Sequence, residues 1–362
     1  MRERLLLKGS LLCLCLTSVL PAAWGANQSM AGYLYVAHRG HEPVPGQLSS
    51  YRISATGGLS LVGSPQDLGK GLTALAVDPS GRFVYVCSMA GKLWGFRSDA
   101  GVLTPLPGSP YSIDGDQESL AIAPSGRFLY MADSAIEIIR GFTLDPASGV
   151  PTQFEGKSAR AANNVAHLVI DRSGRYLYAT ATDTSSAVLS YTIDPVSGSL
   201  TAFAEPAIPG GWFPTLSLSP DGRFLYAWSD LPDITGYAID AGSGRLTEVA
   251  GSPFAASPLS RLAWSSAASE AVALHDDSLS TLAADTTTGA LQWLGSSVST
   301  PGSASEDVVL GPDSRFVYVA DSAASTIAMF SLDAASGRLA FVRSFPTAPR
   351  PFLLSASAPA AR

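Results

Sequence analysis

The chain has 362 residues, of which 46% are hydrophobic and only 15% are charged, and its net charge is −7. This length suits one large all-β domain, and the abundance of apolar residues excludes a largely disordered chain. The acidic balance argues against nucleic acid or an anionic membrane surface as a partner.

The first 25 residues have the pattern of a secretory signal peptide. A basic start, "MRERLLLK", precedes the apolar run "LLCLCLTSVL", and residues 23–25 fit the small-x-small rule for cleavage before Ala26. A retained anchor is the alternative, but the apolar run is shorter than the ~20 residues that a span needs. Cys13 and Cys15 both follow leucine, which argues against a lipoprotein. We therefore expect export to the periplasm or the medium, with no stable membrane insertion after cleavage.

The mature chain offers little metal or redox chemistry. Cleavage leaves Cys87 as the last cysteine and changes the net charge to −9, because the removed segment carries three basic residues and one acidic residue. One cysteine cannot form an internal disulfide, and four scattered histidines give no zinc spacing. We expect no metal, no cofactor and a monomer.

One phrase recurs along the chain. It reads "PSGRFVYVCSM" (79–89), "PSGRFLYMADS" (124–134), "RSGRYLYATAT" (172–182), "PDGRFLYAWSD" (220–230) and "PDSRFVYVADS" (312–322), with an eroded copy within 262–278. The period is near 47 residues, which is typical of repeated supersecondary units.

Each repeat is predicted to contain four short strands. In the third repeat these are 119–123, 127–132, 136–144 and a weak outer strand near 150–155, and we name such strands A to D. The turn "DPASG" (145–149) separates C from D and has echoes in most repeats, and "GSP" recurs beyond it. Four antiparallel strands per repeat indicate a β-propeller blade.

The two ends of the chain predict how the ring closes. The mature chain begins with a B strand, "YLYVAH" (33–38), and ends with an unpaired A strand, "RPFLLSAS" (350–357). We therefore expect the C-terminal strand to complete the N-terminal blade. Residues 26–362 would form a single all-β domain, a seven-bladed propeller without exposed sheet edges.

The recurring phrase could be scaffold or a repeated catalytic motif. Its sevenfold repetition favours scaffold. Its aromatic residues would pack between blades, and its arginines (82, 127, 175, 223 and 315) would cover those rings and bond turn carbonyls.

Acidic residues follow several B strands and form a loose collar at one mouth of the ring. Asp133, Asp183 and Asp276 are candidates for binding a cation or a polyhydroxy ligand through carboxylate oxygens. In the alternative interpretation, each aspartate caps its own turn. Trp212 is a further candidate ligand-binding residue, which packing between blades explains equally well.

The A strands carry polar residues that the repeat does not impose. They include Glu118, His167, Arg261 and the pair Glu306 and Asp307. Charges on an innermost strand are costly to bury without purpose. Glu118, His167 and Arg261 are the candidate catalytic residues: an acid or base, an imidazole and an oxyanion clamp. A histidine held in place only by hydrogen bonds remains the alternative for His167.

At "SPDGRFLYAWSD…GYAIDAGSGRLTEV" the chain resembles the seven-bladed 6-phosphogluconolactonase-type propeller lactonases, over nearly the whole mature chain. The resemblance implies a metal-independent hydrolase with His, Glu and Arg at the channel mouth. His167 and Arg261 match family positions, seven and eight residues before their turns. Gln117-Glu118, Thr182-Asp183 and Ser217 depart from the family pattern.

Two functions from different classes follow. The first is an exported lactonase acting on an uncharged sugar or other small lactone, because the sequence shows no basic cluster that would hold a phosphate. The second is a non-catalytic propeller that binds a protein or a glycan.

Overall fold

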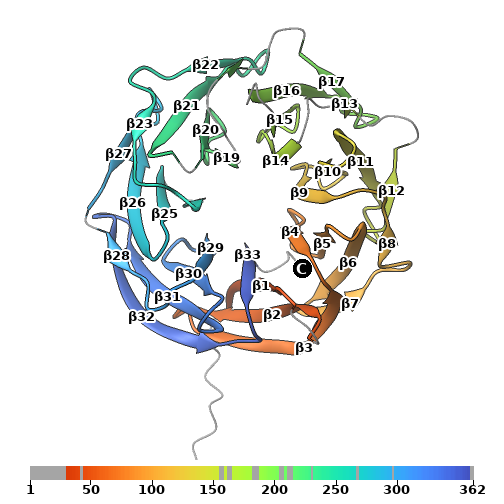
Figure 1. The fold of residues 1–362 in the computed structure, drawn as a ribbon, viewed down its shortest axis with the longest axis horizontal. Coiled ribbons are helices and arrows are strands. Elements are labelled where there is room, and N and C mark those ends of the chain that lie inside the picture. Colours follow the sequence, from red (N-terminus) through yellow and green to blue (C-terminus); the bar gives the residue numbers. More distant parts are fainter. Residues whose placement is uncertain are drawn as a thin grey trace, which may run out of the picture.

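The computed structural model describes residues 30–40, 44–154, 159–160, 165–181, 187–203, 208–209, 215–229, 231–265, 269–295 and 297–358. These residues form seven antiparallel sheets arranged as a ring (Figure 1), with no helix in this part of the chain. The predicted seven-bladed β-propeller is confirmed. The predicted signal peptide, 1–25, lies outside the described residues. No helix that could cross a bilayer is found among the described residues.

Each blade has four strands, A to D from the axis outwards. The first blade consists of β33 (Pro351–Ser357), β1 (Met30–His38), β2 (Gly46–Ser54) and β3 (Leu59–Gly69). Blades two to four consist of β4 (Leu72–Val77), β5 (Phe83–Ser88), β6 (Lys92–Asp99) and β7 (Val102–Pro105); β9 (Gln117–Ile122), β10 (Phe128–Asp133), β11 (Ile138–Leu144) and β12 (Pro151–Gln153); and β14 (Val165–Ile170), β15 (Tyr176–Ala181), β16 (Ala187–Ile193) and β17 (Leu200–Ala202).

Blades five to seven consist of β19 (Thr215–Leu218), β20 (Phe224–Trp228), β21 (Asp233–Ile239) and β22 (Leu246–Glu248); β24 (Arg261–Trp264), β25 (Glu270–Leu274), β26 (Ser278–Ala284) and β27 (Leu291–Trp293); and β29 (Ser305–Leu310), β30 (Phe316–Asp321), β31 (Thr326–Asp333) and β32 (Arg338–Pro346).

In blades two to six a short fifth strand also pairs with strand C. These strands are β8 (Tyr111–Ser112), β13 (Ala159–Arg160), β18 (Ile208–Pro209), β23 (Phe254–Ala255) and β28 (Val298–Ser299). The recurring "GSP" lies just before this strand in blades two and five. There the Ser109 and Ser252 hydroxyls accept hydrogen bonds from the N–H groups of Gly95 and Gly236 on strand C, at 3.1 and 3.0 Å.

The recurring phrase forms the A–B turn and strand B. Strands β5, β10, β15 and β30 are buried along their whole length, because each lies in a sheet covered on both faces by neighbouring blades. The side chains alternate between the two interfaces. Tyr130 packs in the core shared with the fourth blade, whereas Leu129 and Met131 pack with Tyr85 of the second.

The phrase arginines join neighbouring blades, as predicted. The guanidinium of Arg127 lies 5.1 Å from the centre of the Phe128 ring, and its Nη1 donates a hydrogen bond to the Pro195 carbonyl of the next blade at 3.1 Å. Arg82 makes the corresponding contacts with Phe83 and the Pro146 carbonyl. The repeated phrase is therefore a structural element of the blade interface.

The predicted closure of the ring is confirmed. Strand β33 pairs antiparallel with β1, with Leu354 opposite Val36, so the C-terminal strand is the innermost strand of the N-terminal blade. Figure 1 shows β33 between β29 and β4 on the inner edge of the ring. Cys87, on β5, is a free and buried thiol.

Candidate active site

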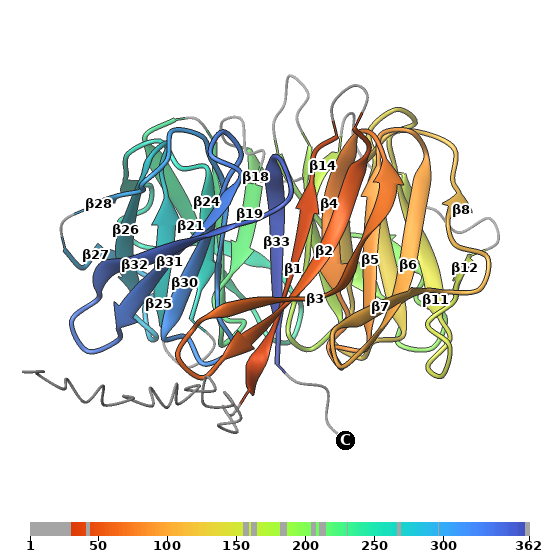
Figure 2. The ribbon, with the colours of Figure 1, turned by 90° about the horizontal axis from the view of Figure 1, so that it is seen from below.

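A cavity of about 790 Å³ lies on the axis of the ring, at the end where the A strands begin. Figure 2 shows the innermost strands side by side along this axis. All seven A strands contribute to the cavity, together with residues that follow strands β1 and β5 or precede strands β4 and β33. Its lining residues are Arg39, Gly40, Gly71, Leu72, Thr73, Ala74, Leu75, Met89, Glu118, Ser119, Leu120, Ala166, His167, Thr215, Arg261, Asp307, Arg350, Phe352, Leu353 and Leu354. Its volume is within the range of small-molecule sites.

The three candidate catalytic residues all line this cavity. Glu118 comes from β9, His167 from β14 and Arg261 from β24, so three different blades bring them together. Their catalytic roles remain predictions, but the convergence that a lactonase requires is present.

The A strands place polar side chains at one common level. Ser119, His167, Thr215 and Asp307 each stand seven residues before their A–B turn and lie opposite the same position of strand B. All four line the cavity. Sevenfold pseudo-symmetry therefore turns one strand position into a ring of side chains around the axis.

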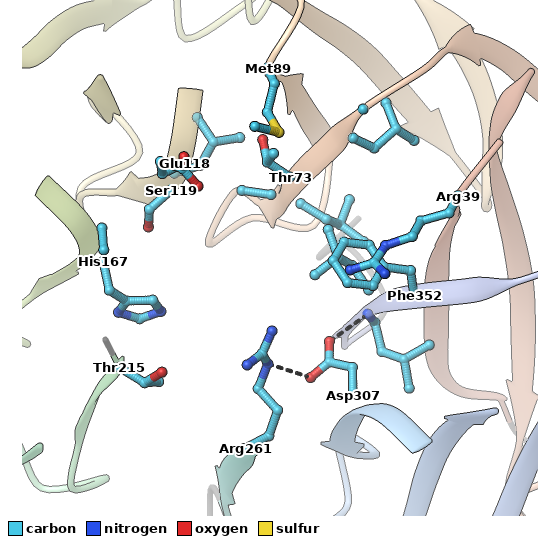
Figure 3. Close-up of a pocket in the computed structure, with 18 of the residues that line it drawn as sticks. Arg39, Thr73, Met89, Glu118, Ser119, His167, Thr215, Arg261, Asp307 and Phe352 are labelled. Atoms are coloured by element: carbon cyan, nitrogen blue, oxygen red, sulfur yellow. Dashed lines mark hydrogen bonds and ion pairs between the residues drawn. The ribbon is translucent and has the colours of Figure 1, made fainter. Parts of the chain in front are cut away.

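A β-bulge sets the position of Glu118. Asp133 pairs with Gln117 and Ala132 pairs with Ser119, so Glu118 is the extra residue that leaves the ladder. Bulges re-aim a side chain and are frequent beside active sites. The Glu118 carboxylate accepts a hydrogen bond from the Ser134 hydroxyl at 3.2 Å, and its side chain lies across the cavity from Arg261 (Figure 3).

Arg261 is held by a buried carboxylate. Its Nε lies 3.5 Å from Asp307 Oδ1, and its Nη1 donates a hydrogen bond to the Ser260 carbonyl at 2.9 Å. Neither of these two contacts uses Nη2. Figure 3 shows the guanidinium directed into the centre of the cavity. The arrangement presents a fixed N–H donor to a bound molecule.

Asp307 also ties the site to the closing strand. Its two oxygens accept hydrogen bonds from the N–H groups of Val308, at 2.9 Å, and of Leu354 on β33, at 2.8 Å. Burial raises the pKa of Asp307, and the positive charge of Arg261 opposes that rise. The charge of Arg261 is thus compensated without occupying the open side of the guanidinium.

His167 is the neutral partner in the cavity. Burial, and in second place the charge of Arg261, lower its pKa to about 4. Its buried Nδ1 has no hydrogen-bond partner among the described residues. At neutral pH this imidazole is therefore unprotonated, which is the form that a general base needs.

The other predicted site residues lie elsewhere. Asp133 is fully buried, and its carboxylate pairs with Arg140 at 2.9 Å. Asp276 is exposed in the turn after β25, and neither aspartate lines the cavity. Asp183 and Trp212 lie outside the described residues. Within the described segments, no three His, Cys, Asp or Glu side chains gather as metal ligands would.

In the sequence, Asp307 stands out as a charged residue of an A strand without an assigned role, and nothing singles out Arg39, Thr215 or Arg350. The shared offset of seven residues before the turn would have found Asp307 and Thr215. No local signal marks Arg39 and Arg350, because the closing of the ring brings them to the cavity.

The fold is that of a seven-bladed β-propeller with a polar cavity on its axis. The sequence profile described as "Lactonase, 7-bladed beta-propeller" matches residues 101–213 and 276–359, more than half of the chain. The chain therefore belongs to the seven-bladed β-propeller lactonase family, as the resemblance predicted.

Solved structures with this fold include two lactonase-type proteins. The periplasmic gluconolactonase of Pseudomonas aeruginosa superposes with a TM-score of 0.72 at 22% identity, over 91% of this chain and 99% of that one. A putative 6-phosphogluconolactonase from Bacteroides uniformis superposes with a TM-score of 0.74 at 19% identity, over 90% and 99%. At these identities the likeness shows the fold alone. No curated protein sequence matches the chain.

Proposed function

We propose that this protein is an exported lactonase that hydrolyses a sugar or other small lactone without a metal. The observation that carries the proposal is the convergence of Glu118, His167 and Arg261 on one cavity of small-molecule size. Membership of the lactonase family supports the reaction class.

Arg261 is the group that would polarise the lactone. Its guanidinium is directed into the cavity, and a carbonyl oxygen placed against its N–H groups would accept a charge-assisted hydrogen bond. The bond strengthens as the oxygen becomes an oxyanion in the tetrahedral intermediate, so it favours the transition state over the bound substrate. The Asp307 carboxylate keeps the guanidinium in place during this change.

His167 or Glu118 would activate the attacking water. The base removes a proton while the water oxygen bonds to the carbonyl carbon, and the ring C–O bond then breaks as the carbonyl re-forms. The departing ring oxygen takes up a proton from the protonated base. One lactone and one water thus give one hydroxy acid, and the base returns to its starting state.

The proposal also places the protein outside the cytoplasm. The signal-peptide pattern of residues 1–25 supports export, and one protein of the same fold is described as periplasmic. Expression of the full chain followed by N-terminal sequencing of the exported protein tests this part. A mature N-terminus at Ala26 supports it, and retention of Met1 in the cytoplasm contradicts it.

A pH-stat assay of the chain from Ala26 on a panel of sugar and aliphatic lactones tests the reaction. Arg261→Ala should lower kcat/KM by about 100-fold, the usual loss for a removed oxyanion donor. Arg52→Ala, at an exposed position of β2, is the matched control and should retain activity. Hydrolysis of every lactone at the uncatalysed rate would overturn the proposal.

A further inference from the structure

Closing the ring brings two arginines from opposite ends of the chain to one wall of the cavity. Arg39 follows β1, and Arg350 precedes β33. The N–H of Arg39 donates a hydrogen bond to the Arg350 carbonyl at 2.9 Å, and both residues line the cavity.

Arg39 is held flat and is weakly compensated. Its guanidinium carbon lies 3.5 Å from the centre of the Phe352 ring, and Figure 3 shows it stacked there beside the cavity. Its side chain is 43% exposed. The carboxylate that pairs with it among the described residues is that of Glu306, at 3.9 Å, and the same Glu306 oxygen accepts the Ser322 hydroxyl at 2.8 Å.

Arg350 is exposed and has an unusual backbone. Its φ is +57°, a conformation that is costly for any residue with a Cβ atom. Within the described part of the chain, no carboxylate lies within ion-pair distance of its guanidinium. Strained backbone of this kind clusters at active sites and ligand-binding sites, and Arg350 lies in the wall of the cavity.

The charges of the cavity are unevenly distributed. The described lining residues include three arginines and two carboxylates, although the whole chain has a net charge of −7. Arg261 and Asp307 compensate each other. The remaining charges lie on different sides of the cavity. Figure 3 shows the Glu118 carboxylate on one side and the Arg39 guanidinium on the other. An anionic group on a bound molecule would be repelled by the first and attracted by the second.

We propose that the substrate is a lactone that carries a separate carboxylate, as the lactones of sugar diacids do, and that Arg39 and Arg350 bind this carboxylate. This inference rests on the proposed lactone hydrolysis at Arg261. Planar guanidinium groups match a carboxylate with two parallel hydrogen bonds. The expected export also favours a carboxylate over a phosphate, because phosphorylated sugars are cytoplasmic metabolites. The sequence alone led us to expect an uncharged substrate. The proposed substrate carries a negative charge instead, because ring closure brings Arg39 and Arg350, which are far apart in the sequence, to the same wall of the cavity.

Two lactones that differ at one carbon test the proposal. D-glucaro-1,4-lactone has a carboxylate at C6 where D-glucono-1,4-lactone has a hydroxymethyl group. Wild-type kcat/KM should be at least about tenfold higher for the first, as expected for charge-assisted hydrogen bonds. In Arg39→Gln and Arg350→Gln this ratio should fall towards one, mainly through KM. Arg343→Gln is the matched control, because Arg343 stacks on Phe345 at 4.6 Å, on an outer strand, and should keep the ratio.

The outcomes separate this inference from the proposed function. Equal hydrolysis of both lactones, or a ratio unchanged in both variants, overturns the carboxylate site and leaves the lactonase standing. Preference for 6-phosphogluconolactone over D-glucaro-1,4-lactone overturns the choice of carboxylate. If neither lactone is hydrolysed, calorimetry measures their binding directly: tenfold tighter binding of the glucarolactone that is lost in Arg39→Gln supports the site, and equal binding overturns it.

Discussion

The hydroxyl of Tyr130 donates a hydrogen bond to the carbonyl of Gly198, across the interface between the third and fourth blades, at 2.7 Å. The same contact recurs at 2.6 Å between Tyr85 and Gly149, and at 2.9 Å between Tyr226 and Gly289. The tyrosine belongs to the phrase on strand B, and the glycine belongs to the C–D turn of the next blade. The two repeated motifs therefore recognise each other between blades.

The close packing of Gly198 at this interface predicts that Gly198→Ala destabilises the folded protein. Gly198 has φ +72°, and an added methyl group would lie 2.6 Å from ring atoms of Phe128 and Phe154. Gly126→Ala is the control, since it has φ +69° but its methyl group would meet no atom closer than 4.0 Å. We expect denaturant unfolding to show Gly198→Ala less stable than Gly126→Ala by about 1–3 kcal/mol. Equal stabilities would show that the blades adjust without cost.

The fold can be predicted well from the sequence because the same pattern of strands and turns recurs in each repeat. A turn glycine, an aromatic strand and an Asp-x-x-x-Gly turn recur often enough that the weak copy at 262–278 can be placed by its spacing. The missing A strand at the start and the spare A strand at the end predict the closure. The short fifth strand that pairs with strand C was not predicted, because the only sequence signal near it is the recurring "GSP".

The site is predicted less completely, for a physical reason. Glu118, His167 and Arg261 are visible because a polar residue stands out on an otherwise apolar inner strand. Whether such a residue faces the cavity depends on bulges at the start of strand A and on which blade lies opposite. Arg39 and Arg350 reach the site only through ring closure, so no local pattern identifies them.

Asp307 is predicted to position Arg261. In Asp307→Asn the guanidinium loses its charge partner, and we expect kcat to fall by about 10–100-fold, with less change in KM, because a misplaced oxyanion donor acts mainly on the transition state. Asp313→Asn is the control, since Asp313 pairs with Arg315 at 4.0 Å in an A–B turn away from the cavity. Steady-state kinetics on protein shown to be folded by its thermal midpoint measure the effect. Unchanged kcat in Asp307→Asn would contradict the positioning role.

The pKa of His167 predicts an acidic limit of activity. If the neutral imidazole is the base, protonation removes it, so kcat/KM should fall as the pH drops and reach half its plateau near pH 4. An unperturbed histidine would give this inflection near pH 6.5, about 2.5 units higher. Initial rates corrected for uncatalysed hydrolysis measure the profile, and His167→Gln should lose the plateau. An inflection near pH 6.5 in the wild type would mean that burial does not control this group.

Asp133 decides between the two interpretations of the acidic collar. Its carboxylate accepts hydrogen bonds from Arg140 Nε and Nη2, at 3.0 and 2.9 Å, and both residues are buried. If the pair is structural, Asp133→Asn leaves a buried guanidinium without its partner and should lower the free energy of unfolding by about 3–5 kcal/mol. Replacing both residues, by Asp133→Leu with Arg140→Met, should recover much of that loss. If Asp133 instead binds a ligand, Asp133→Asn would keep its stability in denaturant and raise KM, and the collar would regain its functional interpretation.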